Sequence, residues 1–201
     1  MHTAGATHLQ AASETVKAKF IYLSADTIFS GHGGNHSEED IAIPGTAIGK
    51  AKLGAENHIR GRSLNHIIIR SAPLLGRGTL DHPSWVDHLR ESDVLAKKMI
   101  FSDHLFRNPV HISVLSDLIH KVIEQDLRNE TLHLGGLTKI SERALADRLM
   151  GALGLSTAHF ETTDHDSRSE PIDFSLNFTN TMKMCRIEAL KLEDSIARLM
   201  A

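Results

Sequence analysis

The chain has 201 residues, of which 41% are hydrophobic and 23% charged, as is typical of a soluble globular protein with a hydrophobic core. The net charge of −3, with acidic and basic residues mixed along the chain, argues against a nucleic-acid-binding surface. Cys185 is the only cysteine, and there is neither a secretory leader pattern nor a long apolar run. We therefore expect a cytoplasmic protein without a disulfide or a membrane span.

Short apolar runs alternate with helical stretches along the chain, and this alternation predicts an α/β fold built on a parallel sheet. The first helix is expected over residues 3–17, with Leu9 and Val16 on its apolar face. The β-type run at 20–24 predicts a strand that is buried on both faces. Residues 30–45, rich in Gly, His, Glu and Pro, predict a long surface loop.

The same alternation continues to the end of the chain. A helix is expected over 46–60, and the run at 65–70 predicts a second buried strand. Ser141 is expected to cap a later helix that Gly154 closes. The other expected elements are a helix within 74–98, a strand at 99–101, a helix capped by Ser113, a strand at 131–134, a polar stretch at 156–183 and a last helix over 186–200.

Two motifs carry a resemblance to a known family. Residues 22–31 read Tyr-Leu-Ser-Ala-Asp-Thr-Ile-Phe-Ser-Gly, and after an acidic loop residues 48–56 read Ile-Gly-Lys-Ala-Lys-Leu-Gly-Ala-Glu. They resemble the dTDP-4-dehydrorhamnose reductase family of extended short-chain dehydrogenases, which typically reads Leu-Ser-Thr-Asp-Tyr-Val-Phe-Asp-Gly and Tyr-Gly-x-Thr-Lys-Leu-x-Gly-Glu at these places. The likeness continues through 69–78, 109–123 and 131–155.

The resemblance implies a partial Rossmann-type parallel sheet, its carboxyl half, with a smaller α/β substrate-binding region. We expect one truncated reductase-like domain over 1–201, with the remnant of the Rossmann sheet at approximately 1–75 and the substrate-binding region mixed into 76–201. By comparison with the family, the chain begins in the helix before the fourth strand. About 80 residues, or two to three βα units, are therefore expected to be missing before Met1.

The family's chemistry makes two departures important. Its members reduce a keto-sugar with a hydride from NAD(P)H, and a tyrosine whose pKa is lowered by a lysine four residues later protonates the product. A Thr near the end of the preceding strand orients the carbonyl. The resemblance places Lys52 at the lysine position, where it would also hold the nicotinamide ribose, but it places Ile48 at the tyrosine position and Ala25 at the Thr position.

The sequence also lacks the Gly-rich turn that receives a dinucleotide's phosphates at the start of such a fold. The glycines at 31–34 follow the wrong strand, and an acidic loop comes after them in place of a helix. We therefore expect no cofactor for this chain, although the family uses NAD(P).

Several side chains remain candidates for a site, each with an alternative interpretation. Ser24 would hydrogen-bond a ligand or only satisfy nearby backbone, and Lys52 would keep its family role or be a surface lysine. Arg70 would hold a diphosphate or pair with a local carboxylate, and Arg168 stands where the family places sugar-nucleotide contacts. The histidines, including His165, lack the spacing of a metal site.

Three hypotheses of function follow. The first is a catalytically impaired relative of the reductases that binds a sugar nucleotide or a protein. Some family members act as regulatory subunits, which makes a non-enzymatic role plausible by analogy. The alternative is a fragment of a genuine reductase whose cofactor-binding part is missing. The third is a decaying gene product with an exposed sheet edge, which a homodimer or a protein partner would have to cover.

Overall fold

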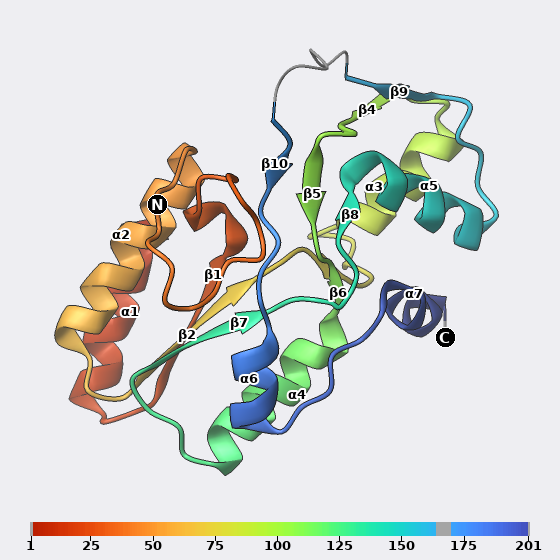
Figure 1. The fold of residues 1–201 in the computed structure, drawn as a ribbon. Helices are drawn as coiled ribbons and strands as arrows, with labels where there is room; N and C mark the ends of the chain where they lie inside the picture. The colour runs from red at the N-terminus through yellow and green to blue at the C-terminus, as the bar shows by residue number, and fades with distance from the viewer. Residues whose placement is uncertain (1, 164–169, 201) are drawn as a thin grey trace.

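A parallel sheet of three strands organises the protein in this computed structural model, which describes residues 2–163 and 170–200. Strand β2 (His66–Ser71) lies between β1 (Phe20–Ala25) and β7 (Glu130–Leu134). Both neighbours run parallel to β2 and all three strands end at the same edge (Figure 1). The β-branched run of β2 is buried along almost its whole length, as expected for a central strand.

Helices cover both faces of this sheet, which confirms the predicted α/β class. Helix α1 (His2–Thr15) packs against α2 (Ala47–Arg62) on one side (Figure 1). Helices α4 (Ile112–Glu124) and α6 (Thr179–Cys185) contribute to the core on the other side. The loop between β1 and α2 begins with a short 3-10 turn, η1 (Asp26–Ile28), which contacts α2.

A second region continues from the carboxyl end of the sheet. Its middle strand, β5 (Leu105–Arg107), pairs in parallel with β10 (Ile172–Asp173) and antiparallel with β8 (Ile140–Ser141). The remaining elements are β3 (Leu74–Leu75), α3 (Trp85–Val94), β4 (Met99–Phe101), β6 (Val110–His111), α5 (Glu142–Leu153), β9 (Phe160–Thr162) and α7 (Leu192–Met200). Helices α3, α5 and α7 share one hydrophobic cluster here.

Two expected helix boundaries were wrong. His111, not Ser113, caps α4, because its side chain accepts a hydrogen bond from the backbone N–H of Ser113 as β6 leads directly into the helix. The expected last helix over 186–200 starts later than predicted, since Arg186 adopts a left-handed conformation (φ +53°) that ends the preceding helix α6 at Cys185. Helix α7 then begins only at Leu192.

Two expected buried surfaces were also wrong. Leu9 in α1 and Val16, the residue after the helix, are 65% and 73% exposed, whereas Ala6 and Gln10 are buried. The helix packs through the small side chain of Ala6, so the larger apolar residues point outward. Strand β1 is not buried on both faces, because Leu23 is 43% exposed and Ser24 is the one buried residue of the strand.

Candidate functional site

The carboxyl end of β1 brings several polar groups together below the turn η1. Ser24 is 5% exposed, and its hydroxyl has no hydrogen-bond partner in the part of the chain that the structure describes. Asp26 and Thr27 follow in η1, and each has a buried oxygen that is likewise without a described hydrogen-bond partner. Buried polar atoms are usually satisfied, so a cluster of unsatisfied ones indicates a place where water or a ligand belongs.

Helix α2 starts directly against this turn. Thr46 caps it by accepting a hydrogen bond from Gly49 N at 3.0 Å. Gly49 permits the close approach, since a Cβ there would lie 2.0 Å from the carbonyl oxygen of Thr27. Ile48 is therefore held at the site in the first turn of α2, where it is 58% exposed and one helical turn before Lys52.

Lys52 reaches back to β1. Its Nζ donates a hydrogen bond to the carbonyl oxygen of Leu23 at 3.0 Å and lies 5.7 Å from the centre of the Tyr22 ring. Partial burial lowers the pKa of Lys52, although the charge of Glu56 opposes this change. The structure thus places Lys52 beside the residue that precedes Ser24, and a role toward a ligand stays a prediction.

Tyr22 is the only tyrosine of the chain, and it lies within β1. Its hydroxyl is buried and has no hydrogen-bond partner among the described residues. Burial, and then the charge of Glu56, raises the pKa of Tyr22. This is the opposite of what a tyrosine acid needs at neutral pH, so the nearby Lys52 does not activate Tyr22 as a proton donor.

Arg70 is engaged inside the protein. Its Nε lies 3.2 Å from Oε2 of Glu56, its Nη1 donates to the carbonyl oxygen of Glu38 at 3.3 Å, and its guanidinium lies 5.4 Å from the centre of the Phe29 ring. The alternative interpretation, an arginine paired with a local carboxylate, therefore describes what is observed. Arg168, the other expected substrate contact, lies outside the described residues.

Two charged residues that the sequence analysis missed meet at this place. Asp26 is 2% exposed, and its Oδ2 lies 3.6 Å from Nη1 of Arg107 in β5. Burial raises the pKa of Asp26 to about 6, against the opposing effect of the positive charge of Arg107. Asp26 stands in the motif that carries the family resemblance, which was the one available signal. Arg107 lies in a strand of three residues and belongs to no motif.

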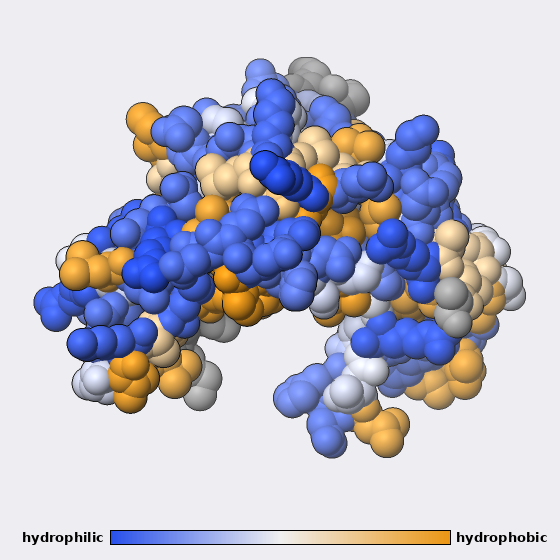
Figure 2. Space-filling view, turned by 90° about the horizontal axis from the view of Figure 1, so that it is seen from below, coloured by the Kyte–Doolittle hydropathy of each residue, from blue (hydrophilic) through white to orange (hydrophobic). Residues whose placement is uncertain are grey.

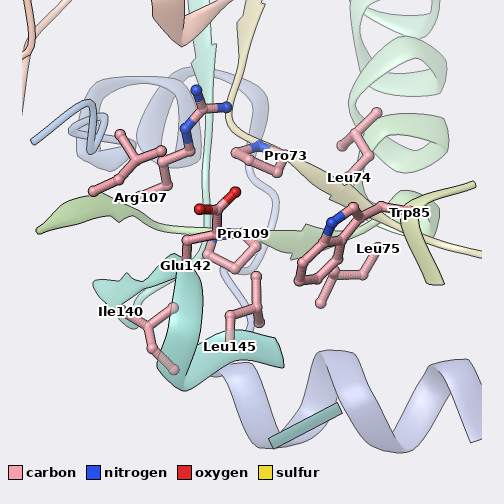
Figure 3. A pocket seen from close by; sticks show the side chains of 10 residues that line it. Pro73, Leu74, Leu75, Trp85, Arg107, Pro109, Ile140, Glu142 and Leu145 are labelled. Atoms are coloured by element: carbon pink, nitrogen blue, oxygen red, sulfur yellow. The ribbon is translucent and has the colours of Figure 1, made fainter. Parts of the chain in front are cut away.

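A pocket of about 200 Å³ opens beside Arg107, between the ends of the sheet and the second region (Figure 3). Arg107 and Glu142 project into it from one side, and Trp85 and Leu75 form part of an apolar wall on the other. Oε2 of Glu142 accepts a hydrogen bond from the backbone N–H of Ser102 at 3.0 Å. The lining residues are Pro73, Leu74, Leu75, Trp85, Leu105, Arg107, Pro109, Ile140, Glu142 and Leu145.

A larger and more polar hollow of about 460 Å³ lies near Asn108, Lys139 and Asp173. Its charges are already paired, because Nζ of Lys139 lies 2.9 Å from Oδ2 of Asp173. None of its described lining residues has a buried side-chain polar atom without a hydrogen-bond partner. The pocket beside Arg107 is therefore the better candidate for a ligand.

The glycines at 31–34 do not form a phosphate cradle. Gly34 has φ +64°, and a Cβ there would lie 2.1 Å from Oδ2 of Asp173. The loop packs onto β10 in this way, and the carboxylate against it would repel a phosphate. Within residues 2–163 and 170–200, no three His, Cys, Asp or Glu side chains gather to hold a metal ion, and His165 lies outside these ranges. No helix in the same ranges has the length and apolar character to cross a membrane.

Comparison with known proteins identifies a family match over most of the chain and several related proteins. Residues 1–195 match the family described as RmlD substrate binding domain. Among curated proteins, methionine adenosyltransferase 2 subunit beta of Rattus norvegicus is 25% identical over 149 residues, and that of Pongo abelii is 26% identical. The match covers 72% of this chain but 45% of each relative, so it spans about half their length.

Solved structures show the same fold. The dTDP-4-dehydrorhamnose reductase of Bacillus anthracis, in complex with NADP, aligns with a TM-score of 0.85 at 17% identity, covering 100% of this chain and 71% of that one. The orthologue from Clostridium acetobutylicum gives the same TM-score and coverage at 19% identity. DesIV, a dTDP-glucose 4,6-dehydratase of Streptomyces venezuelae solved with NAD and TYD, gives 0.82 at 17% identity, covering 98% and 64% of the two chains.

Proposed function

The chain belongs to the RmlD substrate binding domain family, and from this premise we propose that it binds a sugar nucleotide without reducing it. The observation that carries the proposal is Ile48, a side chain with no ionisable proton at the family's tyrosine position, one helical turn before Lys52. Binding and loss of reduction rest on different residues, so they are argued separately.

The pocket beside Arg107 has the chemistry that a sugar nucleotide requires. Trp85, Leu75 and Leu105 offer apolar surface on which a base or a sugar ring packs. Arg107 supplies a fixed positive charge at the pocket, and a guanidinium suits the oxygens of a diphosphate. The carboxylate of Glu142 projects into the same space, where it accepts hydrogen bonds from ligand hydroxyl groups and disfavours a second phosphate.

Reduction fails for lack of proton transfer and carbonyl orientation. An alkoxide formed by hydride transfer has to be protonated, and neither Ile48 nor Ala25 has a proton to give or a hydroxyl to position the carbonyl. Tyr22 does not replace the acid, because burial raises its pKa. The glycines at 31–34 do not fit the phosphates of NAD(P), since they pack against the carboxylate of Asp173.

Calorimetric titration of the purified chain tests both halves of the proposal. We expect dTDP-glucose to bind and NADPH to give no detectable heat. Arg107→Ala should weaken dTDP-glucose binding at least about tenfold, since a charge-assisted contact contributes roughly 1.5–3 kcal/mol. Arg62→Ala, which removes an exposed arginine at the far end of α2, is the matched control and should bind like the wild type. Submicromolar NADPH affinity would overturn the proposal.

The alternative is a fragment of a genuine NAD(P)H-dependent reductase. It is favoured by the match to only 45% of the length of the curated relatives. The genomic sequence upstream of Met1 distinguishes the two: an in-frame strand followed by Gly-x-x-Gly-x-x-Gly would supply a cofactor cradle. Ile48 would still oppose turnover in that longer chain. If the fragment hypothesis holds, reductase activity of the longer chain should rise in an Ile48→Tyr, Ala25→Thr double variant.

A protein-binding role concerns the free edge of β1. Among the described residues β1 pairs on one side only, and Leu23 is exposed in the middle of the strand. Seen from below, the surface is mainly hydrophilic, with apolar side chains gathered around a hollow (Figure 2). Unpaired strand edges invite pairing with another chain. Size-exclusion chromatography should show a homodimer or larger species, and a monomer with a sharp thermal transition would contradict this role.

A further inference from the structure

The guanidinium of Arg107 lies between the buried carboxylate of Asp26 and the pocket. Its Nη1 lies 3.6 Å from Oδ2 of Asp26, close enough for an ion pair but too far for a hydrogen bond. The same side chain lines the pocket of about 200 Å³, is 30% exposed, and has a buried Nε without a hydrogen-bond partner among the described residues. An anionic ligand in the pocket would therefore compete with Asp26 for the positive charge of Arg107.

Besides this cation, only backbone hydrogen bonds from Thr27 and from Asp26 itself stabilise a negative charge on the Asp26 carboxyl group. It is 2% exposed, and Oδ2 accepts no hydrogen bond from any described residue. Burial raises its pKa to about 6, so it carries its charge at neutral pH only by a narrow margin. A carboxylate that loses its counter-charge in such a place takes up a proton rather than remain charged.

The other charged groups around Asp26 are engaged elsewhere. From α2, Lys52 donates to Leu23 O, and Glu56 is bonded by Arg60 and by Arg70 of β2. From β10, Asp173 pairs with Lys139. Lys50 of α2 is exposed to solvent, and Glu142 projects into the pocket from the same side as Arg107. Within the described ranges, Arg107 is the one cation at ion-pair distance from Asp26.

We propose that an anionic ligand enters this pocket together with a proton, because Asp26 is protonated when the ligand's phosphate takes over the charge of Arg107. The inference rests on the proposed function, since it needs a phosphate-bearing ligand beside Arg107. One proton passes from solvent to the carboxyl group of Asp26, and no covalent bond to the ligand forms or breaks. The site is thus a proton-coupled anion site, which prefers its ligand in mildly acidic conditions.

Linkage fixes the direction of the pH dependence. Because the bound form holds a proton that the free form loses above about pH 6, affinity falls as pH rises through neutrality. For one proton the dissociation constant rises by at most about tenfold per pH unit. The reciprocal statement also holds: bound ligand raises the pKa of Asp26 by the same coupling free energy.

Calorimetry with dTDP-glucose in buffers of different ionisation enthalpy measures this proton directly. A sugar nucleotide is the right probe, because its diphosphate lacks the phosphate monoester that titrates near pH 6. At about pH 7 we expect uptake approaching one proton per ligand bound by the wild type. Asp26→Asn should take up none, bind with a flat pH profile, and bind several-fold more tightly at about pH 8, because Arg107 is then shared with no carboxylate.

Asp173→Asn is the control, since it neutralises a buried carboxylate that pairs with Lys139 away from this pocket. It should keep the proton uptake of the wild type. Binding of dTDP-glucose without proton uptake, or uptake that persists in Asp26→Asn, would overturn the inference and leave the proposed function standing. Absence of binding to the wild type between about pH 6 and 8 would overturn both.

Discussion

Arg70 and Glu56 form a hydrogen-bonded ion pair inside the protein, with Nη2 of Arg70 3.0 Å from Oε2 of Glu56. Glu56 is completely buried and Arg70 is 4% exposed. On its other side Arg70 Nη1 lies 3.4 Å from Nε2 of His133, whose pKa falls to about 3 through burial and the charge of Arg70. The imidazole is therefore neutral, with Nδ1 donating to the carbonyl oxygen of His36 at 3.0 Å and Nε2 free to accept.

Removal of one partner of this ion pair should strongly destabilise the protein. Glu56→Ala leaves the charge of Arg70 buried without a partner, and we expect the free energy of unfolding to fall by about 3–5 kcal/mol. Arg60→Ala is the control, because Arg60 bonds the same oxygen at 2.8 Å but is 33% exposed, and its loss should cost under about 1 kcal/mol. Urea denaturation near neutral pH measures both. Equal losses would show that burial of the pair does not matter.

Asn108 joins three segments through one amide. Its Nδ2 donates to the carbonyl oxygens of Gly136 and Leu176 at 3.0 and 2.9 Å, and its Oδ1 accepts from Leu176 N at 3.0 Å. Asn108→Ala should lower the free energy of unfolding by roughly 2–4 kcal/mol, since it leaves buried backbone groups unsatisfied. Asn108→Asp should cost more at about pH 8, because a carboxylate then faces two carbonyl oxygens. An aspartate variant as stable as the wild type would contradict this arrangement.

Sequence patterns predicted the elements whose determinants are local. The run at 65–70 is β2, and Ser141 accepts the capping hydrogen bond from Ala144 N at 3.2 Å. Gly154 ends α5 with φ +67°, as a residue without Cβ does at little cost. These features depend on neighbours within one or two turns of the chain. The family resemblance, confirmed by the match over residues 1–195, supplied the expectation of a Rossmann-type parallel sheet with a smaller α/β region.

The rest depended on contacts between distant segments. Asp26 and Arg107 come together only because β5 follows the end of the central sheet, and no periodicity in either segment indicates that pairing. The sequence could not name the carboxylate that pairs with Arg70, because Glu56 lies on a different element. The exposure of Leu9 was missed for the same reason, because packing against α2 determines which face of α1 is buried.

Gly34 should tolerate no side chain. It combines φ +64° with a position where a Cβ would lie 2.1 Å from Oδ2 of Asp173, so Gly34→Ala meets both backbone strain and a steric clash. Gly33→Ala is the matched control, with φ +85° but no atom within 4 Å of the added Cβ. We expect about 1–2 kcal/mol of destabilisation from strain alone at Gly33 and clearly more at Gly34. Thermal melting of both variants measures the difference, and equal shifts would contradict the packing of this loop on β10.

Asp26→Asn should stabilise the protein at high pH. The folded pKa of about 6 lies above the ordinary aspartate pKa of 3.8, so the native state holds the proton more tightly than the unfolded chain. The stabilising contribution of protonation is complete below 3.8 and is lost as pH rises through about 6. At about 1.36 kcal/mol per pKa unit, the wild type should lose about 3 kcal/mol relative to Asp26→Asn between these limits.

Melting temperatures of the two proteins from about pH 4 to 8 give this difference directly, because groups that titrate identically in both cancel. Asp173→Asn should show the opposite sign. Burial acts to raise the pKa of Asp173, but hydrogen bonds from Ser175 and Lys139 outweigh it and lower that pKa. Its carboxylate therefore stabilises the fold above the unfolded pKa, and the asparagine variant should be the less stable protein at about pH 8. Parallel curves for Asp26→Asn and the wild type would mean that Asp26 is solvated, in conflict with its burial and with the shared use of Arg107.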